Sequence, residues 1–198
     1  MTEEKWDRKL NILTIGRDES HADKYHHPYE PTPYSVLQRI AECPYINESC
    51  EVIDYGCGRG RVGFFLAHAV GCRVKGIEFD PKTYKVACAN LEKFRRKEKV
   101  SFICDYAENV FPNESNTFYF FNPFSVEILR SVMGKIMESY YNDPRRLRFF
   151  FYYPSDEYVS YLMTIPELDF VDEIDCRDIF EGNNPRERVM IFEAAPVC

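Results

Sequence analysis

Apolar positions along the chain follow two different spacings in turn. Short apolar runs predict buried strands at 50–54, 73–79, 100–104, 117–121 and 148–153. Between these runs, apolar residues recur every three or four positions, which predicts helices within 62–70, 81–94 and 129–140. Strands that alternate with helices in this way indicate a parallel sheet that is covered by helices on both faces.

The two ends of the chain depart from this alternation. The first 34 residues are expected to be irregular, with Thr32 and Pro33 as the N-cap and first position of a helix that continues to Ala41. Near the C-terminus, a short polar turn joins strand-like runs at 170–179 and 188–192, so these runs must pair antiparallel. The predicted fold class is therefore α/β, a doubly wound and mostly parallel seven-stranded sheet with an antiparallel last strand.

Composition narrows the class of protein. A chain of 198 residues with 45% hydrophobic residues suits one globular domain. No apolar run approaches the roughly 20 residues of a membrane span, and the mixed charges of the first eight residues do not fit a signal peptide. The eight cysteines include no CxxC pair, and no histidine or carboxylate spacing fits a metal site. We therefore expect a cytoplasmic protein without a metal and without a membrane partner.

A glycine-rich segment follows the first strand and carries the main chemical signal. Asp54 ends that strand, and Gly56, Gly58 and Gly60 follow with one spacer each, so the backbone can turn tightly at the start of a helix. Glu78 ends the second strand and Asp105 ends the third. These carboxylates lie at the carboxyl ends of neighbouring parallel strands, where open α/β sheets bind ligands; Glu78 is suited to ribose hydroxyls and Asp105 to the amine of adenine.

At these residues the chain resembles the class I S-adenosylmethionine-dependent methyltransferases, whose first strand ends in an acid, one spacer and G-x-G-x-G. The resemblance covers residues 50–198 and includes the reversed last strand. It implies that S-adenosyl-L-methionine is the cofactor and that residues 50–198 form its binding domain. The implied cofactor-binding residues are Asp54, Gly56, Cys57, Gly58, Gly60, Glu78, Phe79, Asp105, Tyr106 and Asn122.

Two other interpretations of the same segment stay open. Residues 58–63 spell G-x-G-x-x-G with Glu78 twenty residues beyond Gly58, as in dinucleotide-binding proteins. Counted from Gly56, however, that pattern breaks at Arg61, and it leaves Asp54 and Asp105 without a role. The segment is also compatible with a strand-to-helix turn that binds no ligand.

The end of the fourth strand carries Asn122, Pro123 and Phe124. The triplet is similar to the Asn/Asp-Pro-Pro-aromatic motif of amine and amide methyltransferases, although only one proline is present. The similarity implies catalytic roles: the Asn122 side chain and a proline carbonyl accept from the target N–H, and Phe124 stacks on the substrate. Because methyl transfer requires an aimed lone pair, such positioning is most of the catalysis. The alternative is a strand-ending turn with Phe124 in the core.

The first 49 residues form a second unit in this interpretation, an N-terminal segment and helix that we expect to act as a substrate lid. His26 and His27 lie in it and are candidates for a general base or for solvated surface residues. Basic clusters at 93–99 and 145–148 precede strands, so they fall at the end of the sheet opposite the cofactor. The loops at the cofactor end carry excess acid, which disfavours nucleic acid as a partner.

Together, these features predict an S-adenosylmethionine-dependent methyltransferase that N-methylates a neutral or cationic small-molecule or protein acceptor. The second hypothesis keeps the fold without the chemistry, as a non-catalytic module that binds a partner. The third is an NAD-dependent oxidoreductase. The sequence identifies neither the acceptor nor an oligomeric state.

Overall fold

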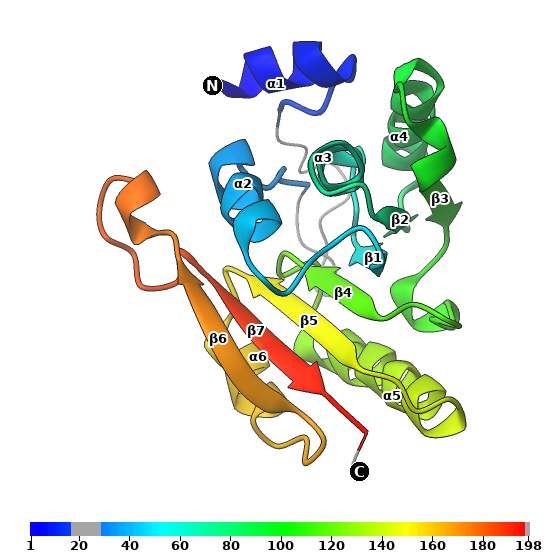
Figure 1. The fold of residues 1–198 in the computed structure, drawn as a ribbon, viewed down its shortest axis with the longest axis vertical. Helices are drawn as coiled ribbons and strands as arrows, with labels where there is room; N and C mark the ends of the chain where they lie inside the picture. The colour runs from blue at the N-terminus through cyan, green and yellow to red at the C-terminus, as the bar shows by residue number, and fades with distance from the viewer. Residues whose placement is uncertain (17–28, 197–198) are drawn as a thin grey trace.

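The computed structural model describes residues 1–16 and 29–196 and contains one central seven-stranded sheet with the strand order β3-β2-β1-β4-β5-β7-β6 (Figure 1). The strands are β1 (Glu51–Tyr55), β2 (Arg73–Glu78), β3 (Val100–Cys104), β4 (Thr117–Phe120), β5 (Leu147–Tyr152), β6 (Asp169–Asp175) and β7 (Arg188–Ala194). The helices are α1 (Glu3–Leu10), α2 (Tyr34–Glu42), α3 (Arg61–Ala69), α4 (Pro81–Lys93), α5 (Val126–Asn142) and α6 (Asp156–Leu162).

The direction of the strands confirms the predicted fold class. β1 pairs in parallel with β2 and β4, and the parallel pairing continues outward to β3 and β5. β7 runs antiparallel to both β5 and β6. Strand order reverses between β1 and β4, and the carboxyl ends of these two strands therefore flank the point where doubly wound sheets bind ligands.

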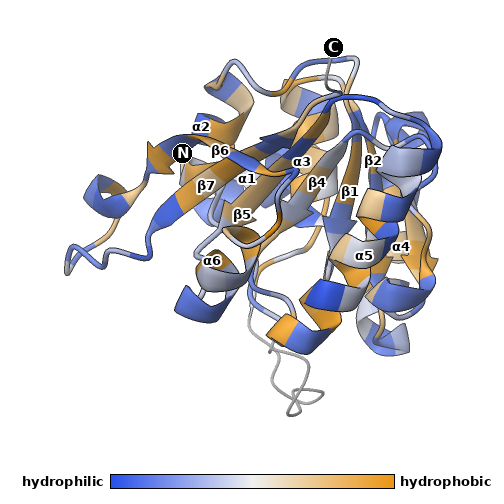
Figure 2. Cartoon of the chain, turned by 90° about the horizontal axis from the view of Figure 1, so that it is seen from below, coloured by the Kyte–Doolittle hydropathy of each residue, from blue (hydrophilic) through white to orange (hydrophobic). Residues whose placement is uncertain are grey.

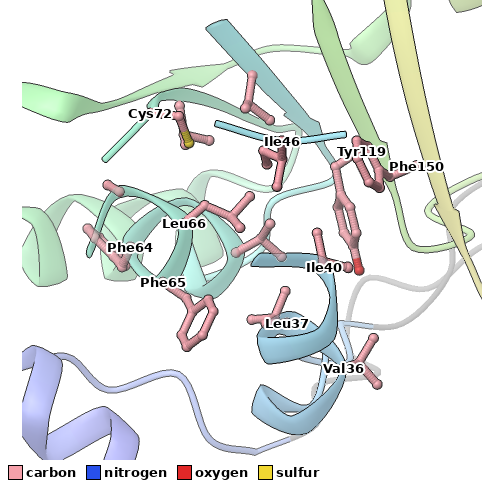
Figure 3. Close-up of a cluster of buried hydrophobic side chains, with 14 of the residues drawn as sticks. Val36, Leu37, Ile40, Ile46, Phe64, Phe65, Leu66, Cys72, Tyr119 and Phe150 are labelled. Carbon is pink, nitrogen blue, oxygen red and sulfur yellow. The ribbon is translucent and has the colours of Figure 1, made fainter. Parts of the chain in front are cut away.

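Alternating side chains of the central strands enter two separate cores. On β4 and β5, Tyr119 and Phe150 join the core with α1, α2 and α3, whereas Phe118, Phe120 and Phe149 join the core with α5 and α6. This division follows from the twofold alternation of side chains along a strand. Figure 3 shows the first core, where side chains of α2 and α3 pack against Tyr119 and Phe150. The apolar colour of the central strands in Figure 2 reflects burial on both faces.

The prediction that the first 34 residues are irregular is wrong for residues 3–10, which form α1. The helix is short and has only two buried apolar residues, Trp6 and Leu10, so it has too few turns to display a period. Acidic residues in its first turn and basic residues in its last favour the helix electrostatically. Trp6 stacks on Tyr34 of α2 and makes an edge contact with Phe65 of α3, which docks α1 on the larger helices.

The predicted start of the second helix is wrong by one residue. Pro33 is the N-cap of α2 and the helix begins at Tyr34, so Thr32 does not cap it. The Thr32 hydroxyl instead makes a 2.8 Å hydrogen bond with the Tyr119 hydroxyl of β4. Two other helices have side-chain caps at their N-termini. Asp80 accepts from the backbone N–H groups of Lys82 and Thr83 at the start of α4, and Ser155 accepts from that of Tyr158 in α6.

Both basic clusters lie at the ends of helices and the starts of strands. Residues 93–99 run from the end of α4 into β3 and are mostly exposed. In the second cluster, Arg145 donates to the backbone carbonyls of Asn113, Ser115 and Ser139, so it fastens a loop to the end of α5. Arg148 donates to the Tyr45 carbonyl and to Glu193. None of these arginines lines the pocket described below.

Three further findings concern the described residues. No helix among them is long and apolar enough to cross a membrane. The seven cysteines among residues 1–16 and 29–196 are all free thiols. No group of three or more histidine, cysteine, aspartate or glutamate side chains in this part of the chain is arranged to hold a metal ion.

Candidate active site

A pocket opens at the carboxyl ends of β1, β2 and β4 and encloses about 1000 Å³ of space, including its open mouth. Three strand ends contribute most of its floor, and residues 29–32 of the N-terminal segment form one wall. The lining residues are Tyr29, Glu30, Pro31, Thr32, Asp54, Gly56, Cys57, Arg61, Val62, Ile77, Glu78, Phe79, Asp80, Thr83, Asp105, Ala107, Glu108, Tyr119, Phe121, Asn122, Pro123 and Phe124.

Asp54 is the most unusual group in the pocket. It occupies the fourth position of β1 between Gly76 of β2 and Tyr119 of β4, and its side chain is only 2% exposed. Its Oδ2 atom is buried and has no hydrogen-bond partner among the described residues. Burial, together with the nearby charge of Glu78, raises the pKa of Asp54 to about 8. A buried carboxylate oxygen of this kind is costly unless a ligand donates to it.

The glycine loop after β1 is shaped by neighbouring protein side chains. Gly56 has a φ of 72°, and a Cβ there would lie 2.5 Å from the Pro123 Cβ. Gly58 has a φ of 56°, and a Cβ there would lie 2.2 Å from the ring of Tyr29. Side chains at either position would therefore be strained and would displace a wall of the pocket. Glycine is therefore required at both positions because Pro123 and Tyr29 pack closely against the loop. The spacing of the glycines in the sequence does not reveal these contacts.

Glu78 links the glycine loop to the second strand. One carboxylate oxygen accepts from the Gly58 N–H and the other accepts from the Asp80 N–H, each at 2.9 Å. Burial raises the pKa of Glu78, and the two N–H donors oppose that shift. Each carboxylate oxygen has a second lone pair, so Glu78 can hold the loop and still accept from a ligand hydroxyl.

Asp105 borders the pocket at the end of β3. Its Oδ1 atom accepts from the Tyr106 N–H and from the Asn109 side chain, which fixes the turn. Tyr106 itself is 50% exposed and stacks on Phe79 with ring centroids 6.1 Å apart. Phe79 lines the pocket whereas Tyr106 does not, so Tyr106 supports the ring of Phe79 at the mouth.

The Asn122-Pro123-Phe124 turn closes the pocket beyond β4. Asn122 adopts a φ of 43°, a left-handed conformation that asparagine tolerates better than most residues. The Phe124 ring is 3% exposed, packs edge-on against Phe120 and belongs to the core under α5, although it also borders the pocket. Phe121 is only half-buried and lines the same side of the pocket, so it offers more ring surface to a ligand than Phe124 does.

Most of the predicted site residues converge on this pocket. Nine of them line it: Asp54, Gly56, Cys57, Glu78, Phe79, Asp105, Asn122, Pro123 and Phe124. Gly58, Gly60 and Tyr106 do not line it; Gly58 and Gly60 are covered by the rings of Tyr29 and Phe102, respectively. His26 and His27 lie outside the described residues. The structure thus brings the predicted carboxylates and the predicted acceptor turn to one cavity.

Several polar and aromatic side chains that line the pocket were not predicted as site residues. These are Tyr29, Glu30, Thr32, Arg61, Asp80, Thr83, Glu108, Tyr119 and Phe121. Arg61 had one available signal, because a cation in the first turn of a helix opposes the helix dipole and needs anionic partners. Phe121 directly follows β4 and shared the strand-end signal, whereas residues 29–32 reach the pocket only through tertiary contacts, for which the spacing of residues gives no signal.

Comparisons with known sequences agree with this architecture. Residues 52–137 match a family model described as a methyltransferase domain. A protein-lysine N-methyltransferase of Saccharolobus islandicus is 37% identical over 71 residues, which cover 34% of this chain and 43% of that protein. A ribosomal protein L11 methyltransferase of Dechloromonas aromatica is 38% identical over 48 residues, 24% of this chain and 16% of that protein. The chain therefore spans less than half the length of these curated relatives.

Solved structures share the fold over a larger part of the chain. The human methyltransferase 10 domain containing protein superposes with a TM-score of 0.60 and 10% identity, covering 98% of this chain and 94% of that one. An RNA methyltransferase of Salinibacter ruber in complex with S-adenosyl-L-homocysteine gives a TM-score of 0.54 and 22% identity, covering 83% and 92% of the two chains. Residues 52–137 therefore match a methyltransferase domain, and the chain shares its fold, with the reversed seventh strand, with these solved methyltransferases.

Proposed function

We propose that this chain is an S-adenosylmethionine-dependent methyltransferase that N-methylates a neutral or cationic acceptor, either a small molecule or a protein, in the cytoplasm. The observation that carries the proposal is the Asp54 carboxylate, which is buried on the pocket floor with one oxygen unpartnered among the described residues. An ammonium group is the natural partner for such an oxygen, and the methyl donor carries one on its methionine part.

The remaining polar groups of the pocket suit the rest of the donor. Glu78 has lone pairs left for ribose hydroxyls, and Asp105 lies one strand further, where it would face adenine. The donor supplies an electrophilic methyl group on a positively charged sulfur. The acidic lining favours that positive charge, since it contains six carboxylate residues and Arg61 as its basic residue.

The acceptor is assigned to the side of the pocket formed by the Asn122 turn. The Asn122 amide oxygen and the Pro123 carbonyl would accept hydrogen bonds from the target N–H groups and aim the nitrogen lone pair at the methyl carbon. Phe121 lines that side as a half-buried ring and is suited to stacking on the acceptor. Pocket carboxylates such as Glu108 are available to take the proton that the nitrogen loses.

The charge of the pocket supports an acceptor that is not a polyanion. Glu30 and Glu108 line it in addition to the carboxylates assigned to the donor. The positive charge of Arg61 is already paired, because its guanidinium contacts Glu3. A phosphate backbone at the mouth would face repulsion without a nearby unpaired cation in the lining. The protein-lysine N-methyltransferase among the relatives is consistent with an amine as the acceptor.

The test is transfer of an isotope-labelled methyl group from S-adenosylmethionine to acceptors in a cell lysate. The wild type should label an amine on a protein or small molecule, and Asn122→Ala should reduce the rate about 100-fold. The affinity of the variant for S-adenosylhomocysteine should fall by much less than the rate, which separates acceptor positioning from any contact of Asn122 with the donor. Binding without any transfer by the wild type would support a non-catalytic module, and label that ribonuclease releases would contradict the acceptor class.

A further inference from the structure

A network of buried polar contacts joins the N-terminal residues to the glycine-loop helix. Arg61, the first residue of α3, lies at its centre and is only 3% exposed. We call this network the clasp; besides Arg61 its members are Glu3, Asp7, Thr14, Thr32 and Tyr34. The clasp therefore joins residues 3–14 and residues 32–34 at one point on α3.

The Arg61 guanidinium makes hydrogen bonds and a ring contact within the clasp. Nε donates to the Thr14 hydroxyl at 2.7 Å, and Nη1 donates to Glu3 and, at 3.2 Å, to the Thr32 carbonyl. The planar group also lies 4.4 Å from the ring centroid of Tyr34. A buried cation at a helix N-terminus is unfavourable by itself, so its retention there requires these partners.

Asp7 is the buried anion that completes the clasp. It lies 3.9 Å from the Arg61 guanidinium and accepts from the Tyr34 hydroxyl at 2.6 Å and the Thr14 hydroxyl at 2.7 Å. It also accepts from the backbone N–H groups of Thr14 and Ile15. Asp7 does not line the pocket, so its contacts serve to hold residues 14–15 and 34 in place.

The clasp extends directly into the wall of the pocket. Thr32 and Arg61 both line the pocket, and the Thr32 hydroxyl bonds to Tyr119, the register partner of Asp54. Tyr29 covers Gly58, and its hydroxyl donates to the Thr14 carbonyl at 2.6 Å. The wall at 29–32 is therefore fastened at Thr14 and Arg61 on one side and at Tyr119 on the other.

Arg59 adds a second tie between the loop and the N-terminal residues. Its guanidinium lies 4.9 Å from the ring centroid of Tyr29 and donates to the Ile15 carbonyl at 2.7 Å. Both arginines of the glycine segment thus contact residues 14–15 and 29–32. Because one loop contacts both the wall and the pocket, displacement of the wall changes the pocket itself.

We infer that Arg61 is a positioning residue that couples docking of residues 3–15 and 29–34 to binding of the methyl donor. The donor binds well only when residues 29–32 are held against the glycine loop, and by linkage the bound donor holds the segment more tightly. The inference rests on the proposed function for the identity of the ligand. Arg61 acts through the wall and has no role in the transfer step itself.

Trp6 provides a reporter for docking, because it is the single tryptophan and lies buried on α1 against Tyr34 and Phe65. In Arg61→Gln we expect Trp6 emission to shift to longer wavelength, with stronger acrylamide quenching. S-adenosylhomocysteine should bind this variant at least tenfold more weakly, and a saturating concentration should reverse much of the emission shift. Arg61→Lys keeps the charge but loses the planar guanidinium with its several N–H donors. Its affinity for S-adenosylhomocysteine should therefore lie between those of the wild type and Arg61→Gln.

The matched control is Arg148→Gln, since Arg148 also binds a backbone carbonyl, a carboxylate and a tyrosine ring but lies away from the pocket. It should lower stability without changing either Trp6 emission or affinity. If Arg61→Gln does not fold, Glu3→Gln replaces it, because the Glu3 side chain is 40% exposed and its substitution should disturb the fold less. This variant should bind S-adenosylhomocysteine about threefold more weakly than the wild type.

Two results would overturn the inference. Exposure of Trp6 in Arg61→Gln with unchanged affinity would show that docking and donor binding are independent. Weakened affinity with Trp6 still buried would make Arg61 a direct ligand of the donor and not a positioning residue. Failure of the wild type to bind S-adenosylhomocysteine would instead contradict the proposed function, and the Trp6 emission of the unliganded variants would still test the clasp.

Discussion

Two aspartates, Asp7 and Asp54, are buried to nearly the same depth, at 3% and 2% exposure, and their surroundings differ completely. Asp7 accepts four hydrogen bonds from protein groups and lies beside the Arg61 guanidinium. Asp54 has an oxygen with no partner among the described residues and lies near another carboxylate, Glu78. The first carboxylate is satisfied by the fold itself, whereas the second is suited to a group that arrives from outside.

Asp7 is therefore a residue that stabilises the protein, whereas Asp54 is a residue suited to binding a ligand. Removing the charge of Asp7 should damage the fold, because it removes the buried one of the two anions beside Arg61 and weakens an acceptor of four hydrogen bonds. Removing the charge of Asp54 should relieve the fold, because it removes an uncompensated carboxylate. The two substitutions are therefore expected to change stability in opposite directions. Burial alone would predict similar losses of stability at both positions.

The largest effect on stability is expected from Asp7→Asn. Breaking a buried ion pair on one side costs about 3 kcal/mol, so the midpoint of thermal unfolding should fall by roughly 10 °C. The matched control is Asp178→Asn, which breaks the ion pair with Arg39 at a site where the aspartate side chain is 68% exposed. That variant should change the midpoint by no more than about 2 °C. Equal losses in the two variants would contradict the importance of the clasp.

A smaller effect, opposite in sign, is expected from Asp54→Asn in the absence of ligand. The pKa of Asp54 is about 8 in the folded protein, above its ordinary value of 3.8. Stability that depends on the protonated form is therefore present below about pH 4 and is lost as pH rises to about 8. Asparagine cannot ionise, so the variant should become more stable than the wild type as pH rises, by roughly 5 °C near pH 8. Thermal unfolding at pH 5 and pH 8 measures it; a difference that does not grow with pH would contradict the assignment.

The smallest effects distinguish two neighbouring aromatic rings. Phe124→Leu should lower stability by about 1 kcal/mol, because that ring packs in the core against Phe120. Phe121→Leu should lower stability less, because that ring is half-buried although it packs against Tyr152, and it should raise the KM for the acceptor about threefold, because the ring also lines the pocket. Unfolding curves and initial rates on both variants make the measurement. If Phe124→Leu instead raised the KM and Phe121→Leu lowered stability more, Phe124 would be the ring that stacks on the acceptor.

The sheet was predictable from sequence because its strands are buried on both faces and appear as apolar runs. The runs around Ile53 and Phe149 show this directly. The reversed strand was predictable because the turn before Arg188 is too short for a crossover. α1 was not predictable, since a helix of two turns with Trp6 and Leu10 as its buried apolar residues displays no period.

The candidate site was predictable only where residues follow strand ends. Asp54, Glu78 and Asp105 are placed by topology alone, and all three line the pocket. The wall at 29–32 depends on contacts such as Tyr29 with Gly58, which no local pattern encodes. The missing partner of Asp54 likewise depends on what surrounds it in three dimensions, so the feature that best supports a donor site required the structure.

The most direct test of the account is calorimetric binding of S-adenosylhomocysteine to the wild type and to Asp54→Asn at pH 7.5. We expect measurable binding to the wild type and about 100-fold weaker binding to the variant. Asparagine cannot form the charge-assisted hydrogen bond to the ammonium group of S-adenosylhomocysteine. Thermal unfolding without ligand should show that the variant is at least as stable as the wild type. Equal affinities, or no binding to either protein, would contradict the assignment of Asp54 as the residue that holds the donor.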